Sequence, residues 1–166
     1  MFDSPIMVKL SALAECLCAQ IAADGLPEPC FCGLVPGEAP AVEYVTDCLD
    51  DDDNGLCGMA WVRLSAVAPI TGIGIPSITV GNCSKSLGFD AEVGIMRCAP
   101  TGDSDGSPPP AADLLTSADL QIADMMAMYQ AIACCQALDE FVIETYTPIG
   151  PEGGAVGGFW TVTAGA

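Results

Sequence analysis

The stretch Leu114–Leu138 constrains this chain more than any other part of its sequence. It is long enough for a helix of about 35 Å. Apolar residues recur at steps of three and four residues along one face of that helix: Leu115, Ala118, Ile122, Met125, Tyr129 and Ile132. The other face is also poor in polar residues, so the helix needs apolar cover on more than one side. We expect a sheet to cover one side and a neighbouring subunit to cover the other.

The charge balance is the second constraint on the chain. Four cations, Lys9, Arg63, Lys85 and Arg97, stand against 22 acidic residues, which gives a formal net charge of −18. Such a surface repels phosphate groups, so we do not expect this protein to bind the phosphate backbone of a nucleic acid. The acidity also has a simpler interpretation, which is that it keeps a chain with 51% hydrophobic residues soluble.

The chain has ten cysteines and no histidine. Its N-terminal sequence, MFDSPIMVKL, lacks the basic region of a secretory signal, and no apolar run approaches the roughly 20 residues of a membrane span. We therefore expect a cytosolic protein whose thiols are mostly reduced. The cysteines in the predicted helices should serve as small buried hydrophobes: Cys16, Cys18, Cys134 and Cys135. The expected exceptions are the Cys30–Phe31–Cys32 segment and the pair Cys48 and Cys57, which brackets an acidic loop.

Periodicity predicts two helices and a run of strands. The first helix is Val8–Asp24, with Gly25 and Pro27 placed to end it. The predicted strands alternate in polarity or are rich in β-branched and aromatic residues: Gly58–Val67, Leu87–Cys98, Glu140–Thr147 and Phe159–Thr163, with shorter extended pieces at Phe31–Val35, Val42–Tyr44 and Ile78–Val80. The element order indicates one α+β domain over residues 1–166, with a mostly antiparallel sheet of four to five strands flanked by two long helices.

The remaining segments are predicted connections, because they are rich in Gly, Pro or acidic residues: Leu26–Pro40, Asp47–Gly55, Ala68–Asn82, Ala99–Ala112 and Pro148–Gly158. Asp113, or Thr116 together with Asp119, is placed to cap the start of the long helix.

The sequence offers little that could carry chemistry. Without histidine there is no Ser–His–Asp or Cys–His pair, and the C-x-C and C-C spacings do not suit a zinc site. Asp50, Asp52, Asn54 and Gly55 match the first half of an EF-hand calcium loop, but the twelfth position, where a bidentate Glu belongs, is Trp61. A solvated acidic turn explains this loop better. We assign no catalytic, cofactor-binding or metal-binding residue, and we do not expect an enzyme.

Four segments, taken in order, resemble the neck proteins of tailed phages that infect actinobacteria: LPEPCFCGLVPGEAPAVEY, CGMAWVRL, LGFDAEVGIMRCAP and YTPIGPEGGAVGGFWTVT. The chain is similar to the head-to-tail connector and tail terminator family of these siphophages. The most specific part is the pattern GPxGG-x-VGG-x-W-T-V-T at Gly150–Thr163, and the resemblance covers most of the chain from about Val8 onward.

This resemblance implies a structural virion protein with a tail-terminator-like fold. Members of the group form rings, usually six-fold, around the DNA path. One face caps the major tail tube protein and the other docks the stopper or head connector, while the genome passes through the lumen without specific binding. The strong acidity would suit such a lumen. The family has no catalytic residues to carry over, and no membrane partner is implied.

Two other functions stay open at this point. A stopper or adaptor of the same phage neck would be a small β-barrel or a mainly helical protein, so two long helices around four or five strands favour the terminator. A cytosolic Cys-based metal or redox protein is the alternative from another class, and it would need a reversible thiol pair of low pKa.

Overall fold

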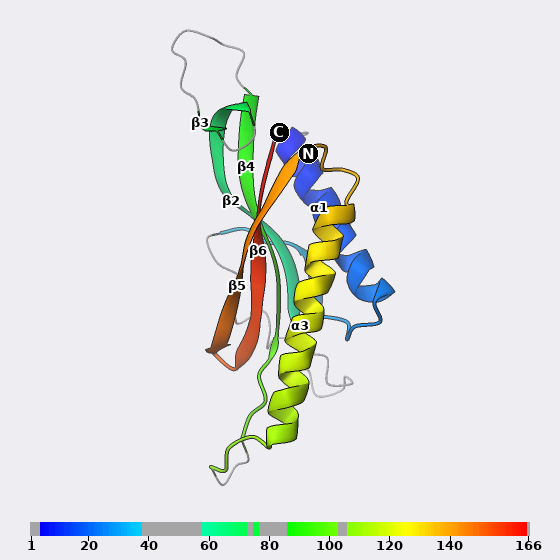
Figure 1. Ribbon diagram of the computed structural model, residues 1–166, viewed down its shortest axis with the longest axis vertical. Helices are drawn as coiled ribbons and strands as arrows, with labels where there is room; N and C mark the ends of the chain where they lie inside the picture. The colour runs from blue at the N-terminus through cyan, green and yellow to red at the C-terminus, as the bar shows by residue number, and fades with distance from the viewer. Residues whose placement is uncertain (1–3, 38–57, 73–74, 77–85, 103–105, 166) are drawn as a thin grey trace.

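Two helices pack against one face of a curved sheet (Figure 1). The computed structural model describes residues 4–37, 58–72, 75–76, 86–102 and 106–165. Its elements in chain order are α1 (Pro5–Ala23), β1 (Phe31–Leu34), β2 (Met59–Gly72), β3 (Ile75–Pro76), β4 (Ser86–Cys98), α3 (Ala111–Cys134), β5 (Phe141–Glu152) and β6 (Ala155–Gly165). The fold class is therefore α+β, as predicted, and the order of the main elements is also confirmed.

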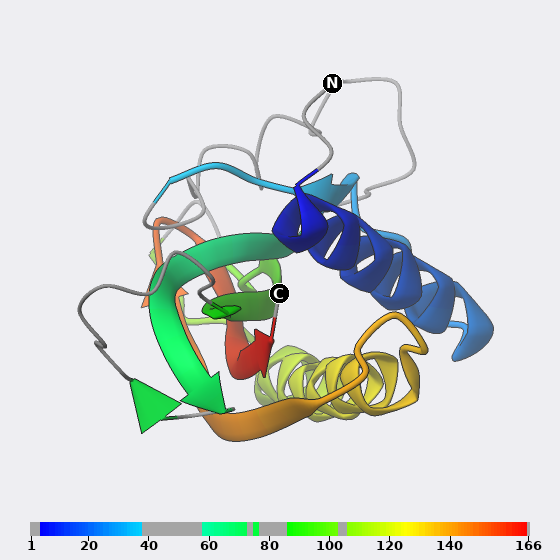
Figure 2. The same cartoon turned by 90° about the horizontal axis from the view of Figure 1, so that it is seen from above.

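The sheet is mixed. Its strand order is β1-β2-β4-β6-β5, and the short β3 pairs with β2 beside this path. The β2–β4, β4–β6 and β5–β6 pairs are antiparallel, but β1 runs parallel to β2. Figure 2 shows the sheet curling around the side on which both helices lie.

Helix α1 forms where its leucine stripe predicts. Pro5 occupies the first turn, where its missing N–H costs no hydrogen bond. Leu10, Leu13 and Leu17 are buried along one face. Gly25 follows the helix with a φ of 66°, a conformation that glycine adopts without a steric penalty, and so ends the helix as predicted.

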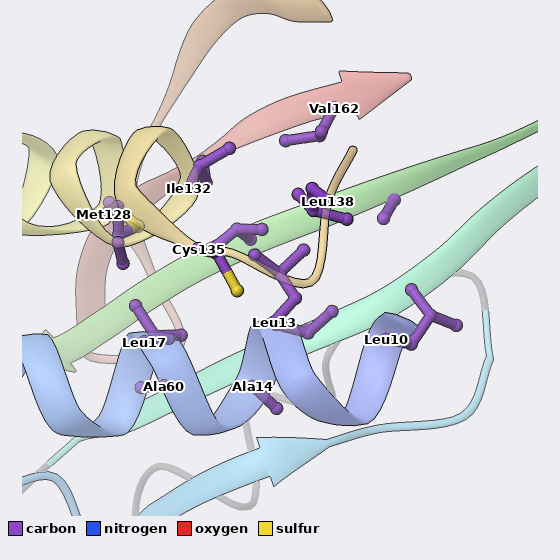
Figure 3. Packing of buried hydrophobic residues seen from close by; sticks show 14 of the residues in the cluster. Leu10, Leu13, Ala14, Leu17, Ala60, Met128, Ile132, Cys135, Leu138 and Val162 are labelled. Atoms are coloured by element: carbon purple, nitrogen blue, oxygen red, sulfur yellow. The ribbon is translucent and has the colours of Figure 1, made fainter. Parts of the chain in front are cut away.

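The main core lies between the helices and the sheet. Figure 3 shows Leu13 and Leu17 of α1 pointing toward Met128 and Cys135, which come from the far end of α3 and the residue after it. From β4, alternate residues enter this core, as their period of two predicts: Phe89, Ala91, Val93 and Ile95. The alternation in β2 is confirmed in the same way, because Ala60 and Val62 face this core.

A second, smaller cluster lies on the opposite face of the sheet. Met59, Trp61, Met96 and Ala155 are buried there, and Phe159 packs against them. The indole of Trp61 lies against Gly94, so closely that a Cβ at that position would collide with the ring. Glycine at this point of β4 is therefore a packing requirement for the neighbouring tryptophan.

The prediction of a loop is wrong at two segments, because strands continue through both of them. Strand β2 extends to Gly72 and occupies the start of the segment predicted as the loop Ala68–Asn82. Strands β5 and β6 similarly absorb most of the segment predicted as the connection Pro148–Gly158. Gly153 and Gly154 join them with φ values of 59° and 81°, the two positive values that a tight hairpin turn of type I′ requires.

The predicted cap of the long helix is also wrong. Helix α3 begins at Ala111, and the residue before it, Pro110, provides no side-chain hydrogen bond. Asp113 lies within the first turn, where its negative charge interacts favourably with the positive end of the helix dipole. The Thr116 hydroxyl donates to the carbonyl of Ala112 (2.9 Å). The predicted extended pieces Val42–Tyr44 and Ile78–Val80 and the acidic turn Asp47–Gly55 lie outside the described residues.

Helix α1 also corrects the expectation that no run approaches a membrane span. By length and composition alone, Pro5–Ala23 could cross a membrane, with a hydropathy of 1.6. Core helices and N-terminal signal sequences both pass the same test. In this structure 28% of the window is buried, and the leucine face of α1 packs against α3 and the sheet.

Replacing Phe89 with Ala should lower the free energy of unfolding by about 3–5 kcal/mol, because a large side chain that is 2% exposed leaves a cavity behind. Val142→Ala is the matched control, since Val142 lies on an edge strand and is 49% exposed, and it should cost less than about 1 kcal/mol. Urea denaturation with the disulfides intact measures both. A loss below about 1 kcal/mol for Phe89→Ala would contradict the placement of β4 in the core.

Candidate functional site

The most unusual surface of the protein is the outer face of α3. The face turned to the sheet buries Asp124, Ala127, Met128, Ala131 and Ile132. Large apolar side chains remain exposed on the opposite face: Leu115 at 64%, Ile122 at 58%, Met126 at 47% and Tyr129 at 43%. We call these four residues, with the exposed Ala118 between them, the α3 stripe.

The position of this stripe corrects one prediction and leaves another in place. The residues predicted to form the apolar face of the helix are mostly the exposed ones, since only Ile132 of that set is buried and Met125 is half-buried. The sheet instead covers the opposite face, where the small Ala127 and Ala131 allow close approach. The predicted need for cover on a second side therefore applies to the α3 stripe. What covers it stays a prediction.

The α3 stripe is nearly free of charge. Between Leu114 and Gln130 the sequence has two charged residues, Asp119 and Asp124. Asp124 is buried, so Asp119 is the one charge exposed along this part of the helix. In a chain with a net charge of −18 this is a marked local depletion, and depletion of charge is typical of the centre of a protein interface.

A buried ion pair fixes the rotation of α3 on the sheet. Arg97 of β4 donates from Nε and Nη2 to the two carboxylate oxygens of Asp124, at 2.6 and 2.7 Å. Its third nitrogen, Nη1, donates to the carbonyl of Pro27 (2.9 Å). Arg97 is 7% exposed and Asp124 is 4% exposed, so each needs the other as a partner.

In the sequence, Arg97 stands out only as one of four cations. A signal was present, because Arg97 continues the alternation of inward positions along β4, two residues after the buried Ile95. A guanidinium at an inward strand position requires a buried acceptor. The mid-helix Asp124, on an otherwise apolar face, was the candidate partner.

An aromatic group holds α3 from the β6 side. The Trp160 indole donates from Nε1 to the carbonyl of Met125 (3.1 Å). Tyr129 and Tyr146 contact the same ring, with centroid distances of 5.8 and 5.4 Å. Gln121 adds a hydrogen bond from Nε2 to the Gly157 carbonyl (2.6 Å). Tyr129 therefore belongs to the α3 stripe on one side and to this anchor on the other.

Tyr146 carries an unusual hydroxyl. Burial raises the pKa of Tyr146 above its usual value of 10.0, the Gln121 amide partly opposes this rise, and the negative charge of Asp124 adds to it. The Gln121 amide lies near this hydroxyl but donates from Nε2 to the Gly157 carbonyl, and the geometry leaves the buried Tyr146 hydroxyl without a hydrogen-bond partner in the part of the chain that the structure describes. The close contact between this hydroxyl and Gly158 leaves no room for a Cβ at that position.

Two concave surfaces accompany the α3 stripe. A cleft of about 370 Å³ lies between the first half of α3 and the sheet, with Arg97, Asp113, Gln121 and Asp124 in its walls. Its most buried polar groups already bond one another, as described above. A groove of about 440 Å³ lies where the start of α1 meets β2 and the end of β1. It is lined by Arg63 and by the apolar residues Ile6, Met7, Leu10, Leu34 and Leu64. We call it the α1–β2 groove.

The described cations are all engaged within the protein. Lys9 donates to the Gly165 carbonyl (2.8 Å), and Arg63 makes a bidentate pair with Glu92 at 2.7 and 2.6 Å. Arg97 is bound to Asp124, and Lys85 lies outside the described residues. Each described cation therefore already has an acceptor within the chain.

The prediction that the cysteines are mostly reduced is wrong for the described part of the chain. Cys16 is bonded to Cys135 and Cys18 to Cys32, with Cα–Cα distances of 5.8 and 5.9 Å. Cys30 and Cys98 are also disulfide-bonded. Among the described cysteines Cys134 is free, and it is exposed. Cys48 and Cys57 lie outside the described residues.

These disulfides connect the parts of the helical layer. The Cys16–Cys135 bond joins α1 to the residue after α3, across a sequence separation of 119 residues, and Cys18–Cys32 joins α1 to β1. Long loops closed in this way lose the most conformational entropy in the unfolded chain. Such bonds persist in oxidising surroundings, which include the surfaces of virions.

Within the described residues, no group of three His, Cys, Asp or Glu side chains is arranged to hold a metal ion, and the acidic loop Asp50–Gly55 lies outside them.

Comparison of the chain with models of known protein families gives no match, and comparison with curated protein sequences gives none either. The α3 stripe is thus the candidate functional site that the geometry supports best.

Alkylation of the unfolded but unreduced protein should modify Cys134 and leave Cys16, Cys18, Cys32 and Cys135 protected. Mass spectrometry after proteolysis should then recover the linked Cys16–Cys135 and Cys18–Cys32 peptides. The same digest after reduction is the control, and all four protected residues should become modified there. Alkylation of Cys16 and Cys135 without reductant, in protein purified in air, would contradict the disulfide that joins the two helices.

Tyr146→Phe should leave the free energy of unfolding at neutral pH unchanged or raise it by about 1 kcal/mol, because a buried hydroxyl without a partner is removed. The folded-state pKa of Tyr146 is raised, so the unfolded state ionises at a lower pH than the folded state. The free energy of unfolding of the wild type is therefore unaffected by this group below pH 10.0 and falls as the pH rises from there through the folded pKa. The variant should therefore lose less stability above that pH than the wild type.

The wild type, taken through the same pH range, is the control for this titration. Both curves are measured by urea denaturation after all free thiols have been alkylated, which prevents thiol–disulfide exchange at high pH. Equal alkaline slopes for Tyr146→Phe and wild type would remove Tyr146 as the titrating group.

Proposed function

We propose that the protein is a ring-forming tail terminator of a siphophage neck, a structural virion protein without enzymatic activity. In this role the ring caps the tail tube and joins it to the head connector around the DNA channel. The observation that carries the proposal is the α3 stripe, an exposed apolar helix face with one charge in a strongly acidic chain. The segment resemblance described above supplies the particular kind of assembly.

The proposed mechanism is geometric. Binding of the ring to the end of the tail tube would occupy the surface that the next tube subunit needs, and this would stop tail growth. The opposite face of the ring would then be the docking surface for the stopper. The strength of each contact depends on buried apolar area and fit, so no side chain needs to act as a nucleophile or base.

The electrostatics of the chain support a lumen through which DNA moves. The net charge is −18, and the described cations Lys9, Arg63 and Arg97 are bound to acceptors inside the protein. A wall of this kind repels phosphate and does not hold the moving genome.

The disulfides support a final location in the virion. A structural protein released from the host works in oxidising surroundings, where disulfides such as Cys16–Cys135 persist. The two helices are also held together covalently, so the proposed contact surface on α3 keeps its position relative to α1.

Electron microscopy of lysates from a phage that lacks this gene tests the proposal. We expect tails of abnormal length beside separate DNA-filled heads, because nothing would stop the tail tube or join it to the head. Supply of the intact gene in trans is the control and should restore joined particles of normal tail length.

The other results of this experiment have definite meanings. Tails of normal length beside unjoined heads would assign the protein to the stopper or adaptor position instead. Normal infectious particles would refute a role in the neck altogether.

A further inference from the structure

We propose that a pocket between α1 and the turn leading into β1 is a site at which a small thiol reacts with the Cys18–Cys32 disulfide. The reaction opens the link between α1 and β1, and it leaves the Cys16–Cys135 link between the two helices closed. This site goes beyond the proposed neck function and does not depend on it.

The pocket presents both ends of one disulfide. Cys18 of α1 and Cys32 of β1 line it, and they are bonded to each other. Cys30, which is also disulfide-bonded, lines the same pocket. The volume is about 340 Å³, and pockets of about 300–1,000 Å³ hold small ligands in other proteins. A small thiol therefore has room to enter beside the Cys18–Cys32 bond.

The Cys16–Cys135 disulfide lies in different surroundings. Cys135 is 4% exposed and belongs to the main core, and Cys16 packs against that core. Figure 3 shows Cys135 among the core residues of α1 and α3. Neither cysteine lines the pocket. The rate of thiol–disulfide exchange depends on access to the sulfur atoms, so a thiol in the pocket reacts with Cys18–Cys32 first.

The two bonds also close loops of very different length. Cys18 and Cys32 are 14 residues apart, whereas Cys16 and Cys135 are 119 residues apart. The entropy that a disulfide removes from the unfolded chain grows with the length of the loop it closes. Opening the shorter loop therefore keeps the larger covalent constraint, and the protein stays folded.

The reaction is a pair of exchange steps. A thiolate attacks one sulfur of the Cys18–Cys32 bond, forms a mixed disulfide with that cysteine and releases the other cysteine as a thiolate. A second thiolate attacks the mixed disulfide and leaves as the oxidised small disulfide. Two small thiols are thus oxidised, and one protein disulfide is reduced to two thiols.

Charge selects the class of thiol. Glu28 is the one charged residue in the described lining of the pocket, and the chain as a whole carries −18. A surface of this kind repels an anionic thiol such as glutathione, but it does not repel an uncharged thiol such as mercaptoethanol. The site therefore favours small uncharged thiols.

Opening the bond loosens β1. This strand has four residues, lies at the edge of the sheet and pairs in parallel with β2. Beyond the ladder, the Cys30 N–H donates to the Gly58 carbonyl (2.9 Å) and the Val35 N–H donates to the Val62 carbonyl (3.0 Å). A short edge strand held by few hydrogen bonds opens more readily than a central strand such as β4.

Reduction of the folded protein by mercaptoethanol tests the site. All free thiols are first alkylated, and thiols that form during reduction are labelled with a second reagent of different mass. In proteolytic peptides, Cys32 reports on the pocket disulfide and Cys135 on the core disulfide. Cys32 should be labelled at least about tenfold faster than Cys135, because access differs. Hydrogen exchange of the product should be faster in β1 and unchanged in β4.

A variant that narrows the pocket tests the route of the thiol. Ala22 lines the pocket and is exposed, so Ala22→Phe should slow the labelling of Cys32 about threefold or more and leave that of Cys135 unchanged. Ala19→Phe is the matched control, because it adds the same ring at an exposed position of α1 outside the pocket lining. It should react like the wild type.

A second variant tests the selection by charge. Glu28→Gln should raise the rate of reduction of Cys18–Cys32 by glutathione about twofold and leave the rate with mercaptoethanol unchanged. Glu15→Gln is the control, since Glu15 is an exposed acid of α1 outside the pocket lining, and it should change neither rate.

The opposite results overturn the proposal. Equal labelling rates at Cys32 and Cys135 would mean that both bonds open through unfolding of the chain. A wild-type rate for Ala22→Phe would exclude the pocket as the route of the thiol. Faster reduction by glutathione than by mercaptoethanol, at equal thiolate concentrations, would exclude selection by charge. Unchanged exchange in β1 with the Cys18–Cys32 bond open would exclude its release.

Discussion

The arrangement of the helical layer depends on the ion pair between Arg97 and Asp124. Both groups are almost fully buried, and to remove one partner of such a pair costs about 3–5 kcal/mol because the other charge is left without compensation. The pair therefore allows one rotation of α3 about its axis. Ile122 lies two residues before Asp124, about 200° around the helix, so a buried Asp124 turns Ile122 and the rest of the α3 stripe outward. A polar contact inside the protein thus decides which apolar surface is exposed outside it.

The other anchors of α3 act in the same direction. Trp160 holds the helix backbone at Met125, and the Cys16–Cys135 bond holds its end to α1. Between them, hydrogen bonds, ring contacts and a covalent link fix the helix at several points along its length. An interaction surface gains from this rigidity, because side chains that are already ordered lose little entropy when a partner binds. The stripe is for this reason a preformed surface on a fixed support.

The sequence predicts the elements of this fold better than their faces and covalent links. Strand β4 was predicted almost residue for residue, because its alternation of polar and apolar residues has one physical solution. The rotation of α3 was not predicted, since its stripe and its sheet-facing residues are similarly apolar and differ mainly in size, with Ala127 and Ala131 on the inner face. The Cys16–Cys135 pairing joins residues separated by 119 positions, a distance over which spacing carries no information. The exposed stripe was itself predicted as a helix face in need of cover. The groups that hold this helix against the sheet were known only from the fold.

The charge of the chain limits the ways in which copies of it could associate. Lys9, Arg63 and Arg97 are each used inside the protein, so no described cation remains to attract a neighbour that carries the same excess of acid. Attraction between copies must then come from apolar area, while repulsion acts over the Debye length of about 8 Å at physiological salt. Apolar attraction is short in range and requires close fit, whereas the repulsion opposes every misplaced approach. A chain built in this way associates most easily through surfaces that carry few acidic residues. The α3 stripe, along which Asp119 is the one exposed charge, is such a surface in the described part of the chain.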